Sequence, residues 1–290
     1  MTRRRLLPRL FLLVVPLLIA GVALVGFLNA RADPVVRRAT VLLPDWPANA
    51  KPVTVALLSD VHIGSMAMDT GRLSRIVGEV NALHPDLIVL AGDFINGHDP
   101  VEGRAYAAAL TRPLARLSAP LGVIAVLGNH DHSAAPAAVT RGLQAAGITV
   151  LANRSVRRGP LVVAGIDDGY TGHAVTGPPL AAARAMGGPL LVVSHGPDVL
   201  PLLPADSAPL VLMGHTHCGQ VVLPGDLFVS KAIDTGERLF DPRYRCGLVR
   251  DPGRLSIVTA GLGTSRLPIR FGAPPDLWLV RLRGSAGRGD

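Results

Sequence analysis

Two histidines stand two residues apart directly after a short apolar run, in the stretch 211–220 with the sequence VLMGHTHCGQ. Side chains at positions i and i+2 of an extended backbone point to the same side, so the rings of His215 and His217 can reach one ion. The glycines Gly214 and Gly219 let the chain bend close to whatever these rings hold. This spacing suits a metal site, provided that the rest of the chain supplies matching ligands.

Four more apolar runs end in side chains that bind metals or transfer protons. The runs cover residues 53–58, 87–91, 123–127 and 190–193, and the side chains that follow them are Asp60 and His62, Asp93, Asn129 and His130, and His195. Short apolar runs of this kind are typical of strands that are buried on both faces. Because five strands end in such residues, we expect the strand ends to converge on one site.

The mixture of imidazole, carboxylate and amide groups indicates which metals the site prefers. Imidazole favours Zn, Fe, Ni or Mn, and carboxylate and amide oxygens make the site harder. The predicted ligands include no thiolate, which argues against a structural zinc site of the cysteine type. We therefore expect first-row metal ions.

The five motifs, read in chain order as SDVH, AGDF, GNHD, SHGPD and GHTH, resemble those of the calcineurin-like binuclear metallophosphoesterases. Members of that family carry DxH, GD, GNH followed by Asp or Glu, an isolated His, and GHxH in the same order. The resemblance spans about residues 51–282, which is nearly everything beyond the N-terminal apolar segment. The chain is also similar to bacterial membrane-associated members that carry GHTHxGQ.

The resemblance implies two divalent or mixed-valence first-row metal ions, such as Mn, Fe or Zn, bridged by Asp93. The two sets of further ligands would be Asp60, His62 and His217 for one ion, and Asn129, His195 and His215 for the other. Ions on the order of 3.5–4 Å apart can share a hydroxide and neutralise the oxygens of a phosphoryl group. His130 would lie beside the metals as the catalytic residue, where it stabilises the transition state or protonates the leaving oxygen.

Some neighbours of the motifs have more than one reading. Asp131 either orients the His130 ring or is a solvated loop carboxylate or helix cap. Arg266 and Arg270 are candidates to meet a substrate phosphate, although arginine is abundant throughout the chain. We expect Cys218 and Cys246 to be buried free thiols, with a bridge between them as the alternative in an exported enzyme.

The N-terminus carries 21 uncharged residues, 10–30, behind Arg3, Arg4, Arg5 and Arg9. This length spans a bilayer as a helix. A cleaved signal peptide is the alternative, because Ala30-Arg31-Ala32 fits a small-x-small cleavage site, but the apolar region is long for one. The sequence TRRRLL also resembles the twin-arginine export motif. We expect a protein of the bacterial cytoplasmic membrane with a single N-terminal span and an extracytoplasmic catalytic domain, although the positive-inside bias is slight.

The remaining patterns predict an α/β fold, a four-layer αββα sandwich in which two mixed β-sheets are flanked by helices, preceded by an N-terminal transmembrane helix. Helices are expected behind Asp69 or Thr70, at 105–117 and at 137–146. Later strands are expected at 148–151, 161–166, 190–193, 210–213, 220–223, within 248–258 and at 277–282, with few helices between them, which predicts a second, more antiparallel sheet. The predicted division is an anchor or signal segment at 1–32, a proline-rich linker at 33–52 and a metallophosphoesterase domain at 53–283.

Length and composition favour one catalytic domain, since 290 residues at 49% hydrophobic composition fill one large core. The net charge of +8 indicates either an anionic partner or a compositional bias of the genome, and only 4% of the residues are aromatic, which disfavours a nucleic-acid partner. The expected function is a membrane-tethered, metal-dependent phosphoester hydrolase of the phosphodiesterase or pyrophosphatase type. Its substrate would be a phosphoester or pyrophosphate, with lipid-linked ones as candidates. The alternatives are a nuclease and a non-catalytic metal-binding scaffold on the same fold, and no oligomeric state is indicated.

Overall fold

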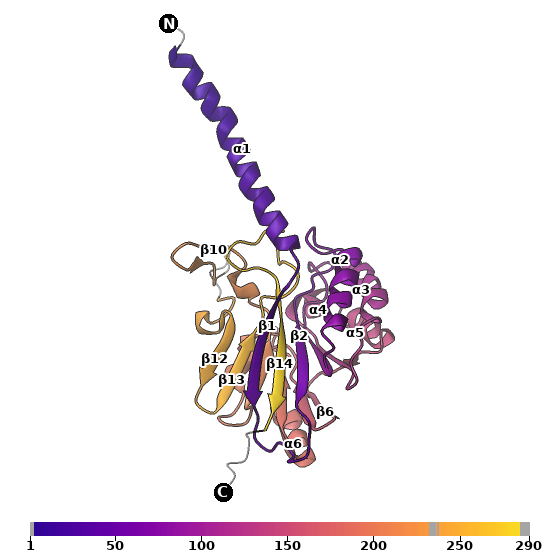
Figure 1. The fold of residues 1–290 in the computed structure, drawn as a ribbon. Coiled ribbons are helices and arrows are strands. Elements are labelled where there is room, and N and C mark those ends of the chain that lie inside the picture. Colours follow the sequence, from indigo (N-terminus) through magenta and orange to yellow (C-terminus); the bar gives the residue numbers. More distant parts are fainter. Residues whose placement is uncertain (1–2, 232–235, 237, 285–290) are drawn as a thin grey trace.

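The computed structural model describes residues 3–231, 236 and 238–284. A long helix, α1 (Arg3–Arg31), projects from one end of a body that is built around two six-stranded sheets (Figure 1). The first sheet has the strand order β1-β14-β2-β3-β4-β5 and the second has the order β12-β13-β9-β8-β7-β6. Both sheets are mixed and helices flank them, so the predicted α/β architecture is confirmed at this level.

The first sheet gathers the opening strands of the body and the last strand of the chain. In chain order its strands are β1 (Val35–Leu42), β2 (Val53–Leu58), β3 (Leu87–Ala91), β4 (Val123–Val126), β5 (Thr149–Val150) and β14 (Asp276–Arg283). All neighbours pair in parallel except β14 and β2. The helices between these strands are α2 (Thr70–Ala82), α3 (Pro100–Leu114), α4 (Asn129–Ala134) and α5 (Pro136–Ala145).

The start of α3 differs from the predicted one at residue 105. Asp99 precedes the helix, and its side chain accepts hydrogen bonds from the backbone N–H groups of Val101 and Glu102. Pro100 occupies the first turn, where its missing N–H costs nothing. The cap and the proline therefore begin the helix one turn earlier than the apolar pattern indicated.

The second sheet holds β6 (Arg154–Arg158), β7 (Leu161–Gly165), β8 (Leu190–Val193), β9 (Leu210–Met213), β12 (Gly247–Asp251) and β13 (Arg254–Val258). The expectation that it is the more antiparallel of the two sheets is confirmed, because its outer pairs β6–β7 and β12–β13 are antiparallel, whereas the first sheet has one antiparallel pair. Its central strands pair in parallel, since α6 (Gly177–Met186) and the 3-10 helix η1 (Pro197–Leu202) supply the crossovers that parallel strands require. Residues 148–151 were also expected in this sheet, but β5 joins the first one.

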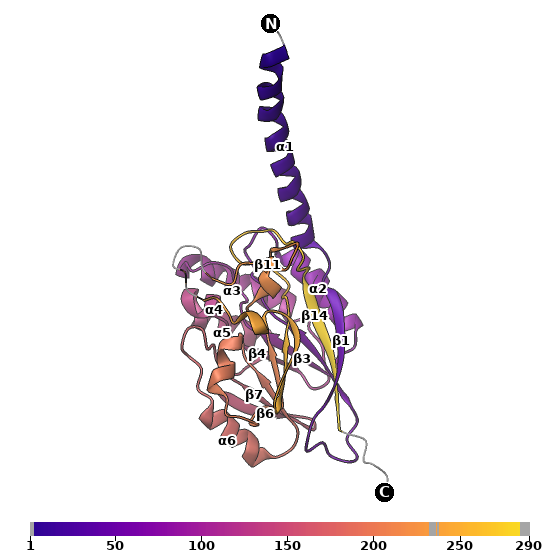
Figure 2. The ribbon, with the colours of Figure 1, turned by 90° about the vertical axis from the view of Figure 1, so that its left-hand side faces the viewer.

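A small hairpin and two 3-10 helices complete the part that the structure describes. A small hairpin joins β10 (Val222–Leu223) to β11 (Leu227–Phe228), and it lies at the end of the body from which α1 leaves (Figures 1 and 2). The 3-10 helices η2 (His217–Gly219) and η3 (Pro242–Tyr244) flank the hairpin in sequence.

Alternation along each central strand explains why its run is apolar throughout. In β2, Val55 and Leu57 lie in the core between the two sheets, whereas Ala56 and Leu58 pack on the side that α2, α3 and α5 cover. A third cluster, which includes Val192 and Leu180, lies between the second sheet and α6. Both faces of the central strands are therefore buried, which holds the strand ends in fixed positions.

Residues 33–52 are not the irregular linker that their proline content suggested. Residues 35–42 form β1, which pairs with β14 from Val35 opposite Asp276 to Leu42 opposite Arg283. The four prolines of the segment, Pro34, Pro44, Pro47 and Pro52, all lie outside this strand, so none of them removes a hydrogen bond of the ladder.

The helix α1 is anchored in the body at its C-terminal end. Gly26 and Ala30 are buried, and the backbone N–H of Arg270 donates a 2.9 Å hydrogen bond to the carbonyl oxygen of Gly26. Arg31 pairs with Asp69 at 2.9 Å. The window Val14–Arg31 has a mean hydropathy of 1.9 and is only 11% buried, so the helix is long and apolar enough to cross a membrane. Length and composition give weak support for a span, because a signal sequence passes the same test.

Candidate metal centre

The predicted ligands follow the C-terminal ends of five strands, β2, β3, β4, β8 and β9, and the fold brings these ends together between the two sheets. Three groups of side chains lie there, and within each group the ligand atoms are within 4.8 Å of one another. The groups are Asp60, His62 and His217; His62, Asp93 and His130; and Asp93, His195 and His215. The expected convergence of strand ends is therefore present in the structure.

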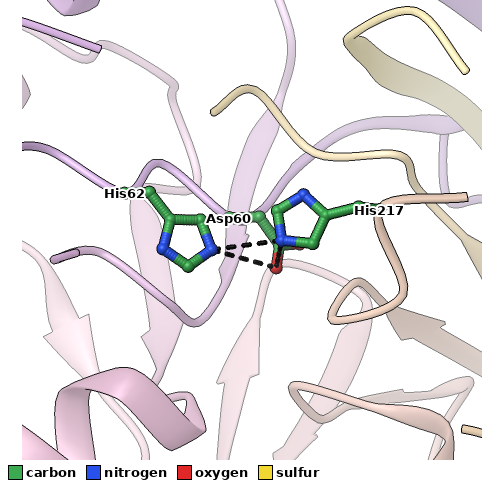
Figure 3. A group of neighbouring side chains, drawn as sticks. All are labelled: Asp60, His62 and His217. Atoms are coloured by element: carbon green, nitrogen blue, oxygen red, sulfur yellow. Dashed lines mark hydrogen bonds and ion pairs between the residues drawn. The ribbon is translucent and has the colours of Figure 1, made fainter. Parts of the chain in front are cut away.

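The first group joins the loop after β2 to the loop after β9 (Figure 3). Nε2 of His62 lies 3.1 Å from Nε2 of His217, which lies 3.4 Å from Oδ1 of Asp60. This carboxylate oxygen is buried and accepts no hydrogen bond. A buried, unpartnered carboxylate oxygen is costly, and a cation held between it and the two imidazoles would remove that cost.

The second predicted ligand group, which consists of Asn129, His195 and His215, brings three lone pairs together. Nδ1 of His195 lies 2.7 Å from the carbonyl oxygen of Ala91, and Nε2 of His215 lies 3.0 Å from that of Leu239. A carbonyl oxygen only accepts, so each of these nitrogens carries a hydrogen, and the other nitrogen offers a lone pair when the ring is neutral, the form that binds a metal. The remaining nitrogens, Nε2 of His195 and Nδ1 of His215, lie 2.9–3.1 Å from each other and from Oδ1 of Asn129. Neutral imidazoles oriented by carbonyl groups on their far side are typical of metal ligands.

Asp93 lies between the two groups. Its Oδ2 is 3.6 Å from Nε2 of His62 and 3.3 Å from Nε2 of His195, while its Oδ1 accepts from the backbone N–H of His130. Burial alone would raise the pKa of Asp93, but His195 and His130 lower it well below its usual value. Burial and the neighbouring His130 lower the pKa of His62 to about 3. The centre therefore holds a charged carboxylate beside a neutral imidazole, which suits a site for cations.

The backbone at the site is strained in a consistent way. Five of the predicted ligands have a positive φ between 48° and 69°: Asp60, His62, Asp93, His215 and His217. A residue with a Cβ in this region costs on the order of 1–3 kcal/mol, which the surrounding packing must offset. Strain concentrated on these residues is the signature of positions whose side-chain direction serves a function.

Two motif glycines allow the loops to approach each other. A Cβ on Gly214 would lie 2.0 Å from Oγ of Ser59 and 2.4 Å from Oδ2 of Asp60, and a Cβ on Gly128 would lie 2.3 Å from Oδ1 of Asp93. Larger residues at these positions would push the carboxylates out of place. Both motifs thus require a glycine because a carboxylate from the loop after another strand lies against it.

His130 lies beside the two groups and contacts them. Its ring meets that of His62 edge to face at 4.8 Å, and His98 stacks on its other side at 4.6 Å. Nδ1 of His130 lies 3.2 Å from the carbonyl oxygen of Gly97, so Nδ1 is the donor there. Nε2 faces Oγ of Ser265 at 3.5 Å. This arrangement leaves Nε2 on the side of the ring where it could exchange a proton with a substrate.

Asp131 caps the start of α4, in line with the helix-cap reading of the sequence, and it also joins two loops, which the sequence did not indicate. Its carboxylate accepts from the backbone N–H groups of Phe94, Ile95 and Gly128 at 2.9–3.2 Å. It is fully buried, and its hydrogen bonds go to these backbone groups, so the expectations of a solvated carboxylate and of a residue orienting the His130 ring are both wrong. Burial and the charge of Asp93 raise the pKa of Asp131 to about 7. The side chain ties the loop after β3 to the loop after β4.

We expect Asp131→Ala to lower the free energy of unfolding by about 2 kcal/mol or more, because three buried N–H groups lose their acceptor. Chemical denaturation of the metal-free protein in detergent would measure this change. Asp131→Asn retains one acceptor oxygen and should lose less. Equal stability of all three proteins would show that the loops hold their positions without this side chain.

Arg270 does not reach a substrate position, because it is fully buried. Its guanidinium donates to the carbonyl oxygens of Ala260, Gly263 and Ala273, and one nitrogen lies 3.2 Å from Nδ1 of His217. It holds the loop after β13 against the ligand loop after β9. Nothing in the sequence distinguishes this arginine from its exposed neighbour Arg266.

Cys218 and Cys246 form a disulfide, so the expectation of two buried free thiols is wrong. The bridge joins the turn at His217 to the segment before β12, across a sequence separation of 28. Oγ1 of Thr216 reinforces the same contact by donating to the carbonyl oxygen of Arg245 at 2.6 Å. The loop that carries His215 and His217 is therefore fastened on both sides, which spacing in the sequence could not reveal.

Comparison with known proteins gives a coherent set of similarities. Residues 53–219 match the family described as Calcineurin-like phosphoesterase. The chain is 30% identical to the metallophosphoesterase YkuE of Bacillus subtilis, covering 80% of this chain and 79% of that protein. It is 30% identical to the phosphodiesterase YaeI of Escherichia coli, covering 81% and 83%. It is also 29% identical to a transmembrane protein with a metallophosphoesterase domain from Danio rerio, covering 93% of this chain and 62% of that protein.

The relatives differ in length. The chain spans 43% to 66% of the length of four curated relatives that it matches, among them the Danio rerio protein. The matched region in the family comparison contains all seven predicted metal ligands and His130.

Proposed function

Because the chain belongs to the calcineurin-like phosphoesterase family, we propose that it hydrolyses phosphodiester or pyrophosphate bonds at a binuclear metal centre and is tethered to a membrane through α1. The observation that carries the catalytic part is the meeting of two buried ligand groups at Asp93. The unpartnered oxygen of Asp60 and the three converging lone pairs at Asn129, His195 and His215 fit two cations.

The proposed ligand assignment follows the two groups. One ion would be held by Asp60, His62 and His217 and the other by Asn129, His195 and His215, with Asp93 shared. Mn, Fe or Zn suit this set of nitrogen and oxygen donors, as divalent or mixed-valence ions. When bound, such a pair supplies a nucleophile at neutral pH and neutralises charge on a phosphoryl group.

The chain's own residues complete the reaction around that centre. We assign His130 the transfer of a proton to the leaving oxygen, because its Nε2 is directed away from the donor bond that Nδ1 makes to Gly97. Arg266 is exposed on the loop that also carries Ser265, and it is available to meet a substrate phosphate. Arg270 keeps His217 and this loop in register.

The test of the catalytic proposal is hydrolysis of bis-p-nitrophenyl phosphate by the purified full-length chain in detergent, with Mn²⁺, Zn²⁺ or Fe²⁺ added separately. Activity with at least one ion, and its loss on chelation, is the expected result. A folded preparation that is inactive with every divalent ion would favour a non-catalytic scaffold. Release of nucleotides from DNA or RNA in place of phosphodiester hydrolysis would favour a nuclease, which the net charge of +8 also suggests.

For the tether, we expect the full-length chain to stay with the membrane fraction after a high-salt wash and to need detergent for release. Burial of about 20 apolar residues far outweighs the attraction of surface charges that salt screens. Fractionation with salt, alkali and detergent in parallel measures this. Release by salt alone would show that α1 is not inserted, and a mature N-terminus at Asp33 would favour a cleaved signal peptide.

The disulfide supports an extracytoplasmic position for the body. Disulfides persist in oxidising compartments and are rare in the reducing cytosol. The bridge between Cys218 and Cys246 lies beside a proposed ligand, so we place the catalytic domain outside the cytoplasm of a bacterial cell.

A further inference from the structure

Two loops that supply site residues, and a hairpin that directly follows a third such loop, lie around the end of α1. The loop after β2 reaches it through the carbonyl oxygen of Met66, which accepts from Arg31 at 3.0 Å. The loop after β13 reaches it through Phe271, whose ring lies where a Cβ on Gly26 would meet it at 2.6 Å. The β10–β11 hairpin joins them, because the N–H of Val222 donates to the carbonyl oxygen of Phe271 at 2.8 Å. The two loops and the hairpin are called the anchor loops below.

The anchor loops expose large apolar side chains to solvent. The exposed fractions are 72% for Met66, 54% for Leu223, 64% for Leu227, 50% for Val229 and 60% for Leu267. Leu223 pairs directly with Leu227 across the hairpin, so both side chains stand on one face of it, and Val229 follows directly after β11. Single exposed apolar residues are ordinary, but five on the loops around one helix end require an explanation.

The contacts with α1 fix how deep these loops would lie in a bilayer. Gly26 is five residues before Arg31, which is about 7 Å along the helix axis. The uncharged segment 10–30 is only long enough to cover the hydrocarbon core, and a shift toward the N-terminus would bury Arg9. Gly26 therefore lies inside the apolar part of the span, and Phe271 and Ile269, which contact it, lie at the same level.

We propose that the anchor loops form a membrane-contacting face that dips into the lipid interface and holds the metal centre at the bilayer surface. This inference rests on the proposed tether through α1. The occupant of the face is the lipid bilayer itself, because a bilayer already surrounds the helix to which the loops are joined. Exposed Arg266 beside Leu267 matches the same setting, since basic groups favour the phosphate level of the interface.

The face also indicates the class of substrate. Ser265, whose Oγ lies 3.5 Å from Nε2 of His130, is only two residues from Leu267. His62 comes from a second anchor loop, and His217 lies on the loop after β9, which leads directly into the hairpin at Val222. Because site and membrane face share their loops, the centre would take phosphoester or pyrophosphate groups carried in lipid headgroups, without drawing the lipid out of the membrane.

Depth-dependent fluorescence quenching tests the face without any need for activity. Both native cysteines are in the disulfide, so one introduced cysteine is the single free thiol for an environment-sensitive fluorophore. The full-length chain would be labelled in separate Leu17→Cys, Leu227→Cys, Leu267→Cys and Met186→Cys variants. Each would be reconstituted into phosphatidylcholine vesicles containing lipids with a spin-label quencher at a shallow or at a deep position of the acyl chain. Met186 is exposed at the end of α6, which lies at the end of the body away from α1 (Figure 1).

The expected result is quenching at positions 17, 227 and 267 and none at 186. Quenching at position 17 alone would overturn the face while leaving the tether intact. Absence of quenching at position 17 would overturn the tether and the face together. Quenching at 186 as strong as at 227 would mean that the body contacts lipid without direction, which also contradicts the inference.

A kinetic comparison tests the substrate class. We expect the double variant Leu223→Glu, Leu227→Glu to hydrolyse phosphatidyl-p-nitrophenol in vesicles about tenfold or more slowly than the wild type, since two leucines leave the apolar phase. On soluble bis-p-nitrophenyl phosphate it should stay within about twofold, as should the control Met186→Glu on both substrates. An equal loss on both substrates, or none on the vesicles, would overturn the inference. Failure of the wild type on the soluble substrate would instead count against the proposed catalysis.

Discussion

Replacing Asp93 by Ala should remove both metal ions from the protein and abolish hydrolysis. Its Oδ2 lies 3.6 Å from Nε2 of His62 and 3.3 Å from Nε2 of His195, so one oxygen serves both ligand groups. Without it, the buried site would lack the carboxylate that would offset the charge of both ions. We expect activity to fall by more than about 10³-fold, since loss of one electrostatic contributor alone costs about 10²–10³-fold.

Elemental analysis of purified proteins checks this prediction. The wild type should hold close to two first-row ions per chain, and Asp93→Ala should hold almost none. Asp60→Ala is the matched control, because the unpartnered Oδ1 of Asp60 faces His62 and His217, while its Oδ2 accepts from the backbone N–H of His215; this variant should lose a single ion. If Asp93→Ala kept one ion as firmly as the wild type does, Asp93 would belong to one group and would not bridge.

Much of this centre could be predicted because each motif is short and can be read directly from the sequence. Each apolar run indicates a buried strand. Because such a strand ends at an edge of its sheet, the residues that follow it can occupy only a few positions. The match to a known family then turned candidate residues into ligand sets. Asp60, His62 and His217 lie together in the structure, with Asp93 beside His62, and their division into ligand sets stays a prediction.

The supporting residues could not be predicted because their partners are remote in the sequence. Asp131 accepts from Phe94 and Ile95, and Arg270 contacts His217 across a separation of 53 residues. A carboxylate or guanidinium in a loop has the same appearance whether it is solvated or buried. Only the folded chain shows that both are buried and that both hold ligand loops in place.

The sheet topology was mispredicted for a related reason. β1 was not predicted because prolines lie on both sides of it, although none lies within the strand. Its partner β14 is at the opposite end of the chain. In the second sheet, the short η1 connection allows β8 and β9 to pair in parallel, where a longer helix would be the expected crossover. Whether two strands pair in parallel or antiparallel depends on the path of the connection between them. The composition of the connection does not determine that path.

The second large effect concerns His130, which should govern chemistry without governing metal content. Its ring contacts His62 and its Nδ1 is committed to the carbonyl oxygen of Gly97, so Nε2 alone is free to exchange a proton with the substrate. His130→Ala should therefore retain nearly two ions. Turnover on a phosphodiester with a poor leaving group, such as an alkyl ester, should fall by roughly 10²-fold or more, the usual contribution of a general acid.

The loss should be smaller on bis-p-nitrophenyl phosphate, because p-nitrophenolate leaves without needing a proton. His98→Ala is the matched control: His98 stacks on the same ring at 4.6 Å but would donate no proton to the substrate, so its removal should change the two rates by similar small factors. Equal losses on both substrates for His130→Ala would argue for a purely electrostatic role. Loss of an ion together with activity would place His130 among the ligands, where its position within 4.8 Å of His62 and Asp93 would also allow it to act.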